Sequence, residues 1–80
     1  MATAEKFREA TKACEHASNK VALADKKVLI GAAVFFAQVA EHIERGNLLT
    51  GEILERCRIA IFLIRDEQMR RKIEVLLFDA

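Results

Sequence analysis

A nearly unbroken apolar run constrains the fold of this chain more than any other feature. Residues 28–40, VLIGAAVFFAQVA, contain twelve apolar residues among thirteen, and the exception is Gln38. A helix through this run is apolar on more than one face, because neighbours such as Phe35 and Phe36 point about 100° apart. One partner helix cannot cover both faces, so the chain needs a second source of burial.

The composition favours helices. The chain has 80 residues, of which 52% are hydrophobic, and it contains no Pro, Trp or Tyr. A domain of this size buries only about 60% of its unfolded surface when it folds alone. We therefore expect one all-α domain over residues 1–80, with long helices and with further burial supplied by another chain.

The first helical block is predicted from a stripe that steps alternately by three and four residues, which is typical of a helix packed against another helix. Thr3 is the predicted N-cap, and Gly46 is the residue expected to end the block. We expect one helix over about residues 3–45, with a kink or break at Ser18–Asn19, where two side chains compete for backbone groups. The stripe consists of Phe7, Ala10, Cys14, Ala17, Val21, Ala24 and Val28.

The second block follows a predicted turn at residues 46–50. Thr50 is the expected N-cap of a helix over about residues 51–78. The polar insert at residues 65–68 is a point where this helix could bend or restart, and we interpret the helix as continuous. The two blocks then form a long antiparallel hairpin, in which the apolar run IAIFLI at residues 59–64 faces the middle of the first run.

This hairpin predicts a dimer. It leaves apolar surface on its outside, which a second hairpin would cover in a four-helix bundle. Gly31 supports close approach of another helix, because glycine costs about 1 kcal/mol relative to alanine inside a helix; a bend is the alternative reason. The sequence leaves open whether the two subunits are parallel or antiparallel to each other. The predicted dimer interface consists of Val28, Phe35, Phe36, Val39, Ile61, Phe62 and Ile64.

The hairpin also predicts a projecting N-terminal segment. Residues 3–17 extend beyond the end of the second helix by roughly 22 Å at the rise of an α-helix. Phe7 is the bulky apolar residue of this segment, and it is expected to anchor a partner protein. The predicted partner-binding residues are Phe7, Lys6, Ala10 and Cys14.

We therefore expect a small non-enzymatic regulator, an inhibitor, anti-activator or adaptor, that binds a target protein through apolar helix faces. Small phage- or plasmid-encoded inhibitors of bacterial regulators have this size and layout, and so do the hairpin co-chaperones of bacterial secretion systems. A co-chaperone or a structural subunit of a larger assembly is therefore one alternative. A second alternative is a nucleic-acid-binding dimer that holds phosphates with Arg70, Arg71 and Lys72, although the net charge is only +1.

The sequence gives no support for catalysis or for a metal or cofactor site. His16 and His42 each follow a glutamate, and neither has the spacing of a helical metal-binding motif. Cys14 and Cys57 are isolated, as expected for buried thiols in a reducing compartment. The apolar run is shorter than the roughly 20 residues that span a bilayer, and the start, MATAEKFREATK, lacks the apolar core of a secretory signal. We expect a cytoplasmic protein that binds no membrane.

Overall fold

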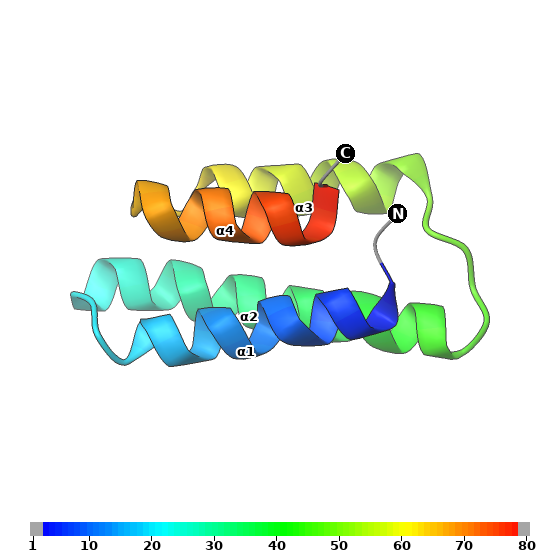
Figure 1. The fold of residues 1–80 in the computed structure, drawn as a ribbon, viewed down its shortest axis with the longest axis horizontal. Coiled ribbons are helices and arrows are strands. Elements are labelled where there is room, and N and C mark those ends of the chain that lie inside the picture. The colour runs from blue at the N-terminus through cyan, green and yellow to red at the C-terminus, as the bar shows by residue number, and fades with distance from the viewer. Residues whose placement is uncertain (1–2, 79–80) are drawn as a thin grey trace.

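Four helices make up most of residues 3–78, which are the residues that the computed structural model describes (Figure 1). They are α1 (Ala4–Ser18), α2 (Leu23–Glu44), α3 (Gly51–Phe62) and α4 (Glu67–Phe78), and these residues contain no strand. The prediction of an all-α fold is therefore confirmed.

The helices form two layers within one chain. In Figure 1, α1 and α2 run antiparallel in one layer, and α3 and α4 form the other layer. Helix α1 also contacts α4, and α2 also contacts α3. Each helix thus has two neighbours, and the core lies between the layers, as in a four-helix bundle.

The first chain reversal follows α1. The predicted break at Ser18–Asn19 is present: the Ser18 hydroxyl donates to the Glu15 carbonyl oxygen at 2.7 Å, and the chain turns back before α2 begins. The predicted projecting segment is wrong, because α1 packs along α2. The Phe7 side chain is fully buried, and its ring centroid lies 6.1 Å from that of Phe36.

A further chain reversal, between α3 and α4, divides the region for which we predict one helix over residues 51–78, and that prediction is wrong. The Asp66 carboxylate accepts a hydrogen bond from the Met69 backbone N–H at 3.1 Å and so caps a new helix. The preceding turn is held from inside, since the Ile64 side chain is only 2% exposed. The Arg70 guanidinium also donates to the Ile64 carbonyl oxygen at 3.1 Å.

The other predicted helix ends are confirmed. The Thr3 and Thr50 hydroxyls accept hydrogen bonds from the backbone N–H groups of Lys6 and Ile53, at 3.3 and 3.2 Å. Gly46 has a φ of 88°, the left-handed conformation that favours glycine after a helix. Local capping chemistry was therefore a reliable guide at these three positions.

The core explains how one chain covers its apolar run. Because each predicted long helix is divided in two, a single chain supplies the four helices that we had assigned to a dimer. Gly31, by contrast, is exposed, and apart from its chain neighbours and the adjoining backbone of α2 no atom lies within 4 Å of the position that a Cβ would occupy. Close approach of another helix is therefore not the role of Gly31 within the described chain. The largest fully buried side chains are Phe7, Phe36, Ile64, Ile73, Cys14 and Cys57.

Candidate functional site

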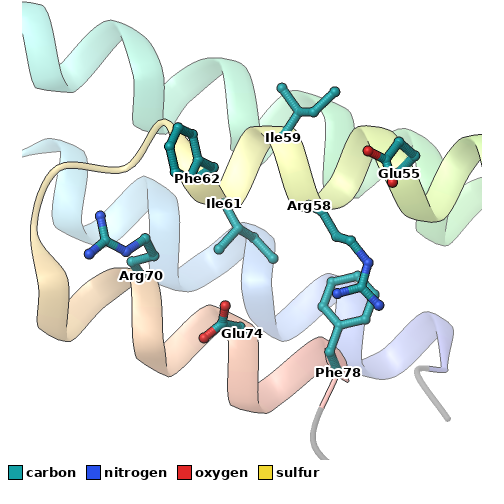
Figure 2. A pocket seen from close by; sticks show the side chains of 8 residues that line it. All are labelled: Glu55, Arg58, Ile59, Ile61, Phe62, Arg70, Glu74 and Phe78. Atoms are coloured by element: carbon teal, nitrogen blue, oxygen red, sulfur yellow. The ribbon is translucent and has the colours of Figure 1, made fainter.

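A groove between α3 and α4 collects the most exposed aromatic side chain of the bundle (Figure 2). Its volume is about 520 Å³. Every residue that lines it comes from these two helices, so it opens on the side of their layer that faces away from α1 and α2. The lining residues are Glu55, Arg58, Ile59, Ile61, Phe62, Arg70, Glu74 and Phe78.

The apolar part of this groove has a buried floor and an open mouth. The Ile61 side chain is only 3% exposed and reaches into the core. Phe62 is 77% exposed and Ile59 is 53% exposed. Single exposed apolar residues need no explanation, but apolar side chains that gather in one groove mark surfaces that bind other molecules.

The charged part of the groove carries both signs. Arg58 lies over the Phe78 ring, with its guanidinium carbon 4.3 Å from the ring centroid, a cation–π contact that holds both side chains across the groove (Figure 2). Arg70 stands at the other end, where it bonds the turn between the helices. Glu55 and Glu74 balance these two arginines, so the groove has no net charge.

Helical spacing explains how these residues meet. Arg70, Glu74 and Phe78 are four residues apart, so they share one face of α4. Residues of α3 at the same kind of spacing, such as Ile59 and Phe62, share a face of that helix. The reversal after α3 brings the two faces side by side. One continuous helix would instead have placed them far apart along its axis.

The predicted dimer-interface residues lie mostly inside the chain. Phe36, Val39, Ile61 and Ile64 are buried in the core, and Val28 and Phe35 are partly buried against it. The prediction is wrong for these six, because α1 and α4 fold over the positions that a second hairpin was expected to cover. Phe62 alone among the seven remains well exposed, and it lines the groove.

The predicted partner-binding residues do not form a surface. Phe7, Ala10 and Cys14 have no exposed area, and Lys6 alone is exposed. The stripe that predicted this site is instead the face of α1 that packs on α2. The prediction of an N-terminal anchor is therefore corrected.

The basic residues of α4 are divided between two surfaces. Arg70 is half-buried and lines the groove with α3, whereas Lys72 lines a separate hollow with Lys20 and Met69. Arg71 is exposed. The three consecutive residues thus point in different directions, and they do not combine into one phosphate-binding patch.

Two further groups of residues were candidates for chemistry, namely the cysteines and the possible metal ligands. Cys14 and Cys57 are free and buried. Burial raises the pKa of each thiol to about 11, with Glu15 adding to the shift at Cys14, so neither thiol ionises near neutral pH. Within residues 3–78 no three His, Cys, Asp or Glu side chains are grouped so that they could hold a metal ion. No described helix is both long and apolar enough to cross a bilayer.

Sequence reasoning missed most of the groove. Ile59, Arg58 and Phe78 were not predicted as site residues, because a continuous second helix places Phe78 about 30 Å from Arg58 at the rise of an α-helix. The signal that could have found them is Asp66, which has the side chain of an N-cap at the start of a charged, amphipathic stretch.

The chain matches no family model, and neither the curated proteins nor the solved structures contain a match.

Proposed function

We propose that the protein is a small non-enzymatic regulator that binds an amphipathic helix of a target protein in the groove between α3 and α4. The observation that carries this proposal is Phe62, a large aromatic side chain that is 77% exposed at the mouth of a groove lined by apolar and charged side chains. By occupying a helix that its target uses elsewhere, the protein inhibits or escorts that target. Its two free thiols support a reducing compartment such as the cytoplasm.

The chemistry of the groove supports a helix as the ligand. Fully burying a Phe or Ile side chain contributes about 1.5–3 kcal/mol, so Phe62 and Ile59 can anchor a partner. A helix offers apolar side chains at spacings of three and four residues, which match an elongated groove between two helices. The balanced rim of Arg58, Arg70, Glu55 and Glu74 favours a helix that carries both signs of charge.

The nucleic-acid alternative has weaker support. Binding of a nucleic acid is strengthened when several basic side chains converge on the same stretch of its phosphate backbone. Arg70 is engaged with the Ile64 carbonyl, and Lys72 lies in another hollow. We therefore carry nucleic acid forward only as an outcome of the test.

Site-specific photo-cross-linking tests the proposal. A benzophenone amino acid replaces Phe62 in one variant and Val75 in a matched variant, and both are expressed in the cells that produce the protein. Val75 is 53% exposed on α4 but does not line the groove. We expect a cross-linked protein at position 62 that is absent at position 75. Identical cross-links at both positions, or cross-links to nucleic acid, would contradict the proposal.

The cross-linked segment is then synthesised as a peptide and its affinity is measured by calorimetry. We expect Ile59→Asp to weaken binding at least about tenfold, since about 1.4 kcal/mol of lost apolar contact has that effect. Val75→Asp makes the same kind of change at a side chain of equal exposure, 53%, and should leave the affinity unchanged. Equal losses in the two variants would place the binding surface elsewhere.

A further inference from the structure

A second apolar surface lies on the opposite layer of the bundle, along α2. Ile30 and Val34 are 44% and 54% exposed and lie one turn apart. Leu23, which is 69% exposed, lies two turns before Ile30 on the same side of the helix. With Ala33 and Ala37, Ile30 and Val34 form the apolar strip of a groove of about 620 Å³ between α1 and α2.

Four charged side chains line this groove, and their signs alternate around the apolar strip. Glu15 and Lys26 stand near the turn that joins the two helices, each three residues from it. Arg8 and Glu41 stand toward the other end. Arg8 is fixed there by donating to the Glu44 carboxylate at 2.7 Å, a bond that holds the pKa of that carboxyl below its ordinary value. Glu41 in turn pairs with Arg45 at the end of α2, so the charges of the groove that take part in no ion pair within residues 3–78 are Glu15 and Lys26. Each helix therefore presents one positive and one negative group, in opposite order.

This arrangement is complementary to itself. A two-fold axis parallel to the helices sets α1 of one copy on α2 of the other, which places Arg8 against Glu41 and Glu15 against Lys26. A two-fold axis across the helices sets each helix on its own equivalent, which places Arg8 against Glu15 and Lys26 against Glu41. Either symmetric pairing therefore joins opposite charges around two facing apolar strips, whereas a partner of one charge sign would meet repulsion at two corners.

From this self-complementarity we propose that the α1–α2 face is the interface of a homodimer. The inference is independent of the target-binding groove, because the two grooves are lined by different helix pairs that form opposite layers (Figure 1). A dimer joined through α1 and α2 leaves both α3–α4 grooves open, so it presents two target sites on its two outer sides.

The size of the face indicates a reversible dimer. The bundle measures 36 by 23 by 19 Å, and the α1–α2 layer spans the longest and shortest of these, so the projected face is 36 by 19 Å, or about 680 Å². Standard stable interfaces bury about 800 Å² on each partner. A face of this extent is of the same order as one standard interface and no larger, so we expect a dimer that dissociates on dilution.

Sedimentation velocity of the full chain over a concentration range from about 1 µM to about 1 mM tests the dimer, since this range covers interfaces of this size class. We expect a monomer–dimer equilibrium. Val34→Asp should raise the dissociation constant at least about tenfold, because it brings an unpaired carboxylate into the contact. Val75→Asp, a change at a side chain of nearly equal exposure on α4, should leave the equilibrium unchanged, and circular dichroism checks that both variants fold.

Charge exchange at the turn end supplies a second readout. Glu15 and Lys26 take part in no ion pair within residues 3–78, so the single variants Glu15→Lys and Lys26→Glu change the proposed contact and should each weaken the dimer. Restoration in the double variant supports α1 on α2, and further loss in the double variant supports α2 on α2. A monomer at every concentration, or equal effects of Val34→Asp and Val75→Asp, overturns the proposal.

Discussion

Replacing Phe7 by alanine tests whether the N-terminal helix belongs to the core. The Phe7 side chain has no exposed area, and its ring stands 6.1 Å from that of Phe36. Truncating a buried Phe to Ala typically costs about 3–5 kcal/mol. Natural domains have about 0.05–0.15 kcal/mol of stability per residue, or about 4–12 kcal/mol for a chain of this length. The variant should therefore lose at least about a quarter of its stability, and at the low end of the stability range it should unfold.

Urea unfolding followed by far-ultraviolet circular dichroism measures this loss. Phe62→Ala is the matched control, since it removes the same side chain where it is 77% exposed, and exposed substitutions usually change stability by no more than about 0.5 kcal/mol. The expected result is a much lower unfolding midpoint for Phe7→Ala than for Phe62→Ala. Equal midpoints would refute the reasoning, because they would mean that α1 contributes nothing to the folded core.

Three further predictions concern a glycine, a helix cap and the two buried thiols. Gly31→Ala should raise the free energy of unfolding by about 1 kcal/mol, because the new methyl group meets no atom within 4 Å in an exposed part of α2; an unchanged or lower melting temperature would contradict this. Asp66→Ala should lower stability by about 1 kcal/mol through loss of the bond to the Met69 N–H, and Asp66→Asn, which keeps an acceptor oxygen, should lose less in the same thermal melts. Burial raises the pKa of Cys14 and Cys57 from 9.0 to about 11, so their contribution to stability is complete below pH 9 and is lost as the pH rises to about 11. Urea midpoints that do not fall over this range more steeply than those of a Cys14→Ala/Cys57→Ala variant would contradict the assignment.

Local chemistry made part of the fold predictable. Thr3 and Thr50 were recognisable as N-caps, and Gly46 as a helix end, since each acts on backbone groups within a few residues. The need to cover the run at residues 28–40 on more than one face was also correct. The requirement comes from the apolar side chains themselves, and it does not depend on which helix does the covering.

The chain reversals after α1 and after α3 were only partly predictable, because Ser18–Asn19 and the polar residues 65–68 mark a break without showing that the chain turns back there. The apolar stripe continues in step from Ala17 through Val21 to Ala24, across a turn that contains no Gly or Pro. Ile64 likewise continues the stripe of α3, yet it is buried in the turn itself. Tertiary burial decided both cases, since packing within one chain gains contacts that a projecting or dimeric helix would lack.

The candidate site was found only in part for the same reason. Phe62 stood out as a bulky apolar residue beside Ile61, and the two do point in different directions. The opposite wall of the groove depends on the start of α4 at Glu67. If the second block is one continuous helix, Phe78 cannot lie beside Arg58, and no groove is predicted.

The central claim is that one chain folds back at residues 19–22 and again at residues 63–66, in addition to the turn after α2, so that its own helices cover most of the apolar run. The most direct measurement is the nuclear Overhauser effect between the ring protons of Phe7 and Phe36 in labelled chain diluted with excess unlabelled chain. The rings stand 6.1 Å apart between centroids in the folded-back chain, whereas a continuous helix would separate the two residues by about 43 Å. The account predicts a cross-peak whose intensity per labelled chain is unchanged by the dilution. A missing cross-peak, or one that fades as unlabelled chain is added, would contradict it.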